Sequence, residues 1–144
     1  MSYHNYFLAY GILKSKNNCD YVKKLKLLST AITSIKLNGF ALFIHKNDKH
    51  TPTIYKTDNV NDYVVCDVYC YSEQNHDELS LLIDDILTKN GSTGKTFEKI
   101  NIEIHISNKI IFINTFTTNN ISDYEYVKYH DYFDYLKNEL NLFI

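Results

Sequence analysis

The sequence of 144 residues predicts a single α+β domain over residues 1–144. Two patterns carry this prediction. Residues 96–107 alternate between isoleucine and polar side chains, which is typical of a strand with one buried face. Residues 77–88 place leucine and isoleucine at positions i, i+3, i+4 and i+7, which is typical of an amphipathic helix. Hydrophobic residues make up 44% of the chain, which is enough to form a core.

The other elements follow from the same rules. In chain order we expect a strand at 6–10, a helix at 19–30, two strands within 31–46 joined by a bend at 38–39, a short strand at 51–57, a strand at 63–71, the helix at 77–88, a hairpin of 96–107 with 110–118, and a helix over the tail 124–144. No repeat, linker or second domain separates these segments.

Charge and composition exclude several classes of function. The formal net charge is −2, so we expect no nucleic-acid partner and no membrane partner. All fifteen basic residues are Lys and none is Arg, so no guanidinium is present to clamp a phosphate or carboxylate. The abundance of Lys, Asn, Ile and Tyr indicates an A/T-rich genome, such as that of a virus, a phage or a low-GC bacterium.

The N-terminal and cysteine patterns predict a cytoplasmic protein, in the host cytoplasm if the source is viral. The first ten residues lack a basic region followed by a long apolar run, so we expect no signal peptide. Three Cys suit a reducing compartment, and Cys66 and Cys70 lie roughly 13 Å apart on one strand, too far for a disulfide. The six His are scattered, so we expect no metal site and no cofactor.

The stretch NGSTGKT, residues 90–96, ends like a nucleotide-binding loop. However, Lys89 stands where that motif requires its first Gly, and a helix precedes the stretch while a strand follows it. A phosphate-binding loop needs the opposite order, because its amides and the N-terminus of the following helix face the same phosphate. We therefore expect a helix-to-strand loop that does not bind ATP or GTP.

Seven segments, in order along nearly the whole chain, resemble motifs of the gamma-glutamylcyclotransferase-like superfamily, which includes gamma-glutamylamine cyclotransferases. They are YFLAYGILK, GFALF, TPTIYKT, VVCDVYCY, LLIDDIL, TFEKINIEI and YHDYFDYLK. The resemblance implies a mixed, mostly antiparallel curved sheet or β-barrel with flanking helices. It also implies a cavity at the end of the first strand, with Tyr10, Gly11, Ile12 and Leu13 as the ligand-binding residues.

The resemblance further implies a reaction. In the family, backbone amides of the turn after the first strand bind the substrate carboxylate, which suits Gly11 because glycine lets the backbone approach closely. A Glu at a helix end takes a proton from the substrate's α-amine and passes it to the leaving group, so that 5-oxoproline is released. In this chain Leu87 aligns with that Glu, and a shift of one residue gives Thr88. Neither side chain transfers a proton as a carboxylate does.

Three interpretations remain open. The first is a degenerate cyclotransferase that binds a small anionic or amino-acid-like ligand in the family cavity. The second is an active cyclotransferase with a displaced acid, either Asp85 or Glu98; Asp84 matches a family Asp that supports the helix end, and both Asp residues also suit a solvated helix face. The third is a protein–protein interaction module that uses its many Tyr residues as contacts.

Overall fold

The structure, a computed structural model, describes residues 4–11, 13–91, 97–106 and 108–141. Eight strands, three α-helices and two 3₁₀ turns are assigned in this part of the chain. In order they are β1 (His4–Ala9), α1 (Asp20–Leu28), β2 (Ala31–Asn38), β3 (Phe40–His45), β4 (Asp48–Lys56), β5 (Tyr63–Ser72), η1 (Glu73–Asn75), α2 (His76–Gly91), β6 (Phe97–Ile106), β7 (Lys109–Thr118), η2 (Ile121–Asp123), β8 (Tyr124–Tyr126) and α3 (Tyr132–Leu140).

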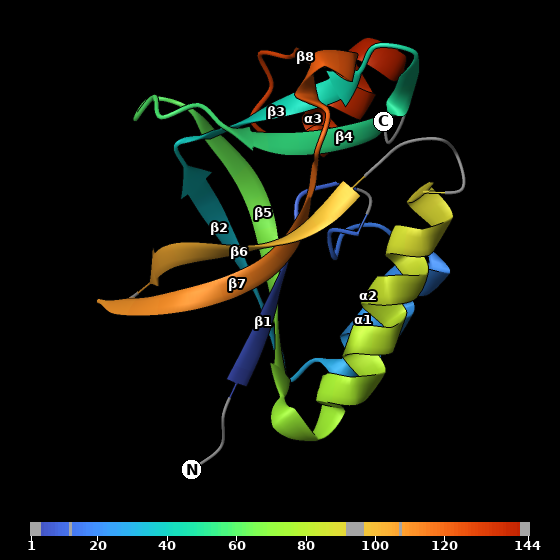
Figure 1. Ribbon diagram of the computed structural model, residues 1–144, viewed down its shortest axis with the longest axis vertical. Coiled ribbons are helices and arrows are strands. Elements are labelled where there is room, and N and C mark those ends of the chain that lie inside the picture. Colours follow the sequence, from blue (N-terminus) through green and yellow to red (C-terminus); the bar gives the residue numbers. More distant parts are fainter. Residues whose placement is uncertain (1–3, 12, 92–96, 107, 142–144) are drawn as a thin grey trace.

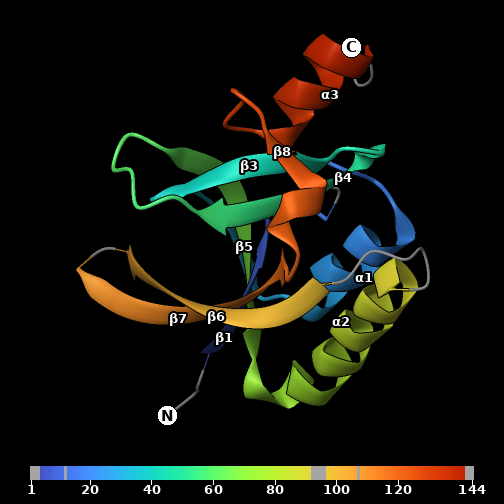
Figure 2. The ribbon, with the colours of Figure 1, turned by 45° about the horizontal axis from the view of Figure 1, so that its top comes forward.

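The strands form two sheets. The larger has the order β2-β5-β1-β7-β6, and the smaller has the order β4-β3-β8. All pairings are antiparallel except that of β1 with β7, which is parallel. Figure 2 shows the curved β6–β7 hairpin beneath the three-stranded sheet. The predicted fold class, α+β with a mixed, mostly antiparallel curved sheet and flanking helices, is confirmed; among the described residues the sheets do not close into a barrel.

The central strands β1 and β5 are buried on both faces. Residues of one parity, such as Leu8 and Val64, join a core shared with β3, β4 and α3. Residues of the other parity, such as Phe7 and Tyr69, join a second core shared with α1 and α2. Figure 1 accordingly shows α1 and α2 side by side on one flank of the large sheet, and the small sheet with α3 at the other end.

Local sequence explains the sharp turns. The predicted bend at 38–39 is confirmed: Gly39 joins β2 to β3 with φ of 82°, a conformation that glycine adopts without steric cost. Asn108, with φ of 65°, lies in the predicted turn of the β6–β7 hairpin. Pro52 lies within β4, which is tolerated because β4 is an edge strand.

The predicted helix over residues 124–144 is wrong in its extent. Residues Tyr124–Tyr126 form β8, which pairs with β3, and the helix begins only at Tyr132. The cause is Asp131, whose carboxylate accepts a hydrogen bond from the backbone N–H of Phe133 at 2.9 Å and so caps the helix. The prediction placed Asp131 inside the helix, because an acidic residue is compatible with a helix interior as well as with an N-cap.

No helix in the described ranges is long and apolar enough to cross a membrane. The stretch NGSTGKT begins with Asn90 and Gly91, the last two residues of α2, and precedes β6, in the helix-to-strand order expected from the sequence. Its residues 92–96 lie outside the described residues, so the absence of nucleotide binding stays a prediction.

Candidate functional site

The described residues after β1, namely Gly11 and residues 13–17, are called here the β1 loop. It leaves the sheet through two successive turns, in which Lys14 N–H donates to the Gly11 carbonyl at 3.1 Å and Asn17 N–H donates to the Lys14 carbonyl at 3.0 Å. These bonds satisfy backbone groups of residues that lie outside the strands. The β1 loop is therefore a defined turn structure at the end of a buried strand.

Two side chains of strand β5 hold the β1 loop in place. The carboxylate of Asp67, which is buried, accepts hydrogen bonds from Ser15 N–H at 2.7 Å and from the Ser15 hydroxyl at 2.8 Å. The Tyr69 hydroxyl donates to the Leu13 carbonyl at 2.6 Å. Burial raises the pKa of Tyr69, so its hydroxyl stays protonated as a donor. Two side chains of one strand thus hold consecutive parts of the loop.

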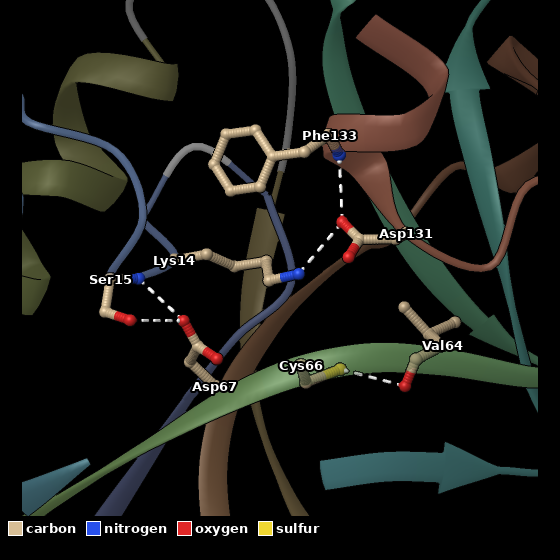
Figure 3. Close-up of polar contacts among 7 residues, drawn as sticks. All are labelled: Lys14, Ser15, Val64, Cys66, Asp67, Asp131 and Phe133. Carbon is tan, nitrogen blue, oxygen red and sulfur yellow. Dashed lines mark hydrogen bonds and ion pairs between the residues drawn. The ribbon is translucent and has the colours of Figure 1, made fainter. Parts of the chain in front are cut away.

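Helix α3 fixes the same loop from the other side (Figure 3). The Lys14 ammonium lies 2.9 Å from the Asp131 carboxylate, and the Lys14 side chain is only 6% exposed. The ammonium also lies 5.3 Å from the centre of the Phe133 ring, within the range of a cation–π interaction. Asp131 therefore both caps α3 and neutralises a buried cation of the β1 loop.

A cavity of about 130 Å³ lies beside the end of β1, and it is called here the β1 cavity. On the same measure one water needs roughly 10–15 Å³, so there is room for a small molecule. Apolar and aromatic side chains form most of the wall, with a few polar groups among them, as is common in ligand sites. The described lining residues are Phe7, Leu8, Ala9, Tyr10, Gly11, Leu13, Tyr21, His50, Thr51, Pro52, Ile86, Phe97, Thr115 and Phe116.

Three of the four predicted ligand-binding residues line the β1 cavity: Tyr10, Gly11 and Leu13. Ile12 lies outside the described residues. Tyr10 is buried, and desolvation raises the pKa of its phenol although a side-chain hydrogen bond with Thr53 lowers it. Tyr10 is therefore a neutral hydroxyl in this wall. The geometry brings these residues to a cavity, whereas their contact with a ligand stays a prediction.

Gly11 is required at its position by a close contact. A Cβ atom built on Gly11 would lie 2.8 Å from Cγ of Pro52, closer than real Cβ contacts occur. Its φ lies outside the left-handed region, so backbone conformation alone does not demand glycine. Strand β4 thus packs directly on the β1 loop, and glycine leaves room for the proline ring.

The candidate acids are exposed and are not among the described residues that line the β1 cavity. Asp85, in α2, accepts a hydrogen bond from the Tyr21 hydroxyl at 3.1 Å, and Tyr21 itself lines the cavity. Glu98 follows the cavity residue Phe97 in β6, and strand alternation directs its exposed side chain to the opposite face. Asp84 forms an ion pair with Lys99 at 2.6 Å. Of the three acids, Asp85 thus has a direct hydrogen-bonded connection to the cavity wall.

Leu87, which aligns with the family's Glu, belongs to α2, but its side chain lies outside the described set. The same holds for Thr88. The replacement of the family's general base by Leu87 or Thr88 therefore stays a prediction from the sequence.

Sequence reasoning missed part of the wall. Tyr21 of α1, together with His50, Thr51 and Pro52 of β4, lines the β1 cavity. In the sequence, Tyr21 is recognisable only as one apolar position of a helix, and His50 only as one of several scattered His. Both reach the cavity because β4 and α1 pack against the end of β1, and no spacing in the sequence signals that.

Comparison with known proteins supports the resemblance at the level of fold. No family model matches the sequence, and no curated protein sequence matches it significantly. Among solved structures, the chain is similar to one described as gamma-glutamyl cyclotransferase, with a TM-score of 0.50, 15% identity, and coverage of 86% of this chain and 70% of that chain. It is also similar to YkqA from Bacillus subtilis, with a TM-score of 0.53, 14% identity, and coverage of 96% and 43%.

A third similar structure is an uncharacterized protein from Homo sapiens, with a TM-score of 0.49, 17% identity, and coverage of 85% of this chain and 69% of that chain. The architecture of the described chain is thus that of the gamma-glutamylcyclotransferase-like fold. At such identities the likeness establishes the fold, and activity has to be argued from the site.

Proposed function

We propose that this protein is a degenerate cyclotransferase that binds a small anionic or amino-acid-like ligand in the β1 cavity without turning it over. One observation carries the proposal: the cavity lies at the β1 loop, where the fold's resemblance implies a substrate site, and none of its described lining residues is Asp or Glu. A general acid–base group typically contributes about 10²–10⁴ in rate. Without such a group, we expect the protein to bind the ligand but not to convert it.

The wall of the β1 cavity supports a ligand with two different ends. Phe7, Phe97 and Phe116 offer apolar surface to a hydrocarbon part. The β1 loop offers backbone groups that are held in a fixed geometry. Asp67 bonds to Ser15, Tyr69 bonds to Leu13, and Asp131 forms an ion pair with Lys14. Backbone amides in a turn bind an anion without a charged side chain. A γ-glutamyl compound with an apolar amine part has both features.

The test measures binding and turnover separately. The wild-type protein is titrated with γ-glutamyl amino acids and γ-glutamylamines by calorimetry, and 5-oxoproline is measured after incubation. We expect saturable binding with no 5-oxoproline above the blank. Binding by none of the panel contradicts the proposal, as does rapid release of 5-oxoproline.

A gain-of-function variant sharpens the test. Leu87→Glu restores the carboxylate at the position that aligns with the family's Glu, and we expect it to release 5-oxoproline slowly. Leu81→Glu is the matched control, because Leu81 lies in the same helix and is 71% exposed. It adds the same charge away from the cavity, and we expect it to stay inactive.

The second candidate, an active cyclotransferase with a displaced acid, is favoured by the contact between Asp85 and Tyr21. In this case the Asp85 carboxylate accepts a proton from the substrate amine directly or through the Tyr21 hydroxyl, and returns it to the leaving amine. Turnover by the wild type that is lost in Asp85→Asn identifies this candidate. Loss in Glu98→Gln instead assigns the role to Glu98.

A further inference from the structure

The charge of the β1 cavity wall is unusual for a site that takes an anion. None of the described lining residues is Lys, and the chain contains no Arg. His50 is the single residue in this described lining whose side chain can carry a positive charge. Imidazole is also the side chain whose charge changes most readily near neutral pH.

The backbone around His50 is fixed. Asp48 accepts two hydrogen bonds, from His50 N–H at 3.0 Å and from the Thr51 hydroxyl at 2.9 Å, so one carboxylate orders the start of β4. Two residues beyond His50, the ring of Pro52 packs against Gly11 of the β1 loop. His50 and the β1 loop therefore lie on neighbouring parts of the same wall.

His50 is exposed and belongs to the described lining of the β1 cavity, so it lies where the cavity meets solvent. The aromatic residues Phe7 and Phe116 of the lining are instead buried. Among the described lining residues, the polar side chains of His50 and Thr51 in β4 are thus more exposed than the aromatic residues Phe7 and Phe116. A ligand with one ionised end and one apolar end fits this arrangement.

We propose that His50 binds the carboxylate of the ligand at the rim of the β1 cavity, beside the backbone of the β1 loop, and so selects ligands that carry an anionic group there. This inference rests on the proposed function and names the side chain that gives it specificity. The imidazolium donates a charge-assisted hydrogen bond to a carboxylate oxygen, whereas a neutral carboxamide at the same place loses the charge contribution.

The experiment compares two probes that differ in one group: γ-glutamylbenzylamine, which has an α-carboxylate, and its α-carboxamide. Both are titrated by calorimetry at pH 6 into the wild type, His50→Gln and the control His105→Gln. His105 is exposed on the outer part of β6, with a side chain 71% exposed and 3.8 Å from Glu103. We expect the wild type and His105→Gln to prefer the carboxylate by about tenfold, and His50→Gln to lose this preference.

The outcomes separate the two proposals. If the wild type binds neither probe, both the proposed function and the role of His50 are overturned. If it binds the carboxylate probe and His50→Gln keeps the tenfold preference, only the role of His50 is overturned. A second readout is the imidazole Cε1–H resonance of His50, which we expect to shift on addition of the carboxylate probe while that of His105 does not; an unmoved resonance under saturation contradicts the inference.

Discussion

The β1 loop and helix α2 border the same cavity but are held in place by different forces. The β1 loop is fixed by polar groups that are buried or nearly so, namely Asp67, Tyr69 and the ion pair of Lys14 with Asp131. Helix α2 is fixed by an apolar stripe, while its polar contacts at Asp84 and Asp85 are exposed. A buried polar contact is costly to break, and an exposed one contributes little.

The two kinds of contact have different consequences for the β1 loop and for helix α2. Directional hydrogen bonds hold the loop backbone in one geometry, which the proposed anion site requires. An apolar stripe holds a helix firmly but tolerates changes of the exposed side chains that it carries. An exposed residue of α2 can therefore change while the β1 loop stays in place. Five variants test this comparison, from the largest expected effect on the free energy of unfolding to the smallest.

The apolar stripe of α2 gives the largest expected effect. Leu79 is fully buried, so Leu79→Ala leaves a cavity and should lower the free energy of unfolding by about 3.5 kcal/mol. Urea denaturation followed by circular dichroism measures it. Leu81→Ala in the same helix is the control and should change stability by less than about 0.5 kcal/mol, since Leu81 is 71% exposed. Equal effects would contradict the packing described here.

The ion pair between the loop and α3 comes next. Lys14→Met removes the cation and leaves the Asp131 carboxylate without it, at an expected cost of about 2.5 kcal/mol. The value lies below that of a fully buried pair because the Asp131 side chain is 21% exposed to water. Lys16→Met is the control: Lys16 is exposed and also lies over Phe133, at 5.9 Å. If both variants cost the same, the pair contributes nothing beyond the cation–π contact.

The Asp67 carboxylate is expected to contribute slightly less. Asp67→Ala leaves the Ser15 N–H and hydroxyl without their acceptor, and should cost about 2 kcal/mol. Asp67→Asn keeps an acceptor oxygen and should recover part of this loss. Urea denaturation gives the ranking, and an Asn variant as unstable as the Ala variant would show that the charge, rather than the acceptor, holds the loop.

The contact between Gly11 and Pro52 should have a smaller effect. Gly11→Ala forces the proline ring to move and should cost about 1.5 kcal/mol. In a Pro52→Ala background the same change should cost clearly less, because the obstructing ring is absent. A double-mutant cycle by urea denaturation measures this coupling, and strictly additive effects would refute the contact.

The exposed contact between Tyr21 and Asp85 should matter least for stability. Tyr21→Phe removes the donor to Asp85 and should change the free energy of unfolding by no more than about 0.5 kcal/mol. The same variant should lower 5-oxoproline release only if Asp85 is the displaced acid. A large loss of stability would show that this contact belongs with the buried ones, and would weaken the contrast between loop and helix.

Sequence periodicity predicts the secondary structure wherever the period is strong. Isoleucine alternation in β6 and the leucine stripe of α2 predicted both elements, because each period places apolar side chains on one face whatever the partner is. Motif order predicted the fold class and the position of the β1 cavity. The same patterns failed at Tyr124–Tyr126, where pairing with β3 outweighs local helix preference.

Which side chains meet depends on packing between elements that are distant in the sequence. Asp67 and Ser15 are separated by 52 residues and Tyr21 and Asp85 by 64, and no local period relates them. His50 reaches the cavity because Pro52 packs on Gly11. Periodicity reports which face of an element is apolar, but it carries no information about which distant element covers that face. The polar groups of the site are therefore brought together by packing, although each of these residues can be read from the sequence.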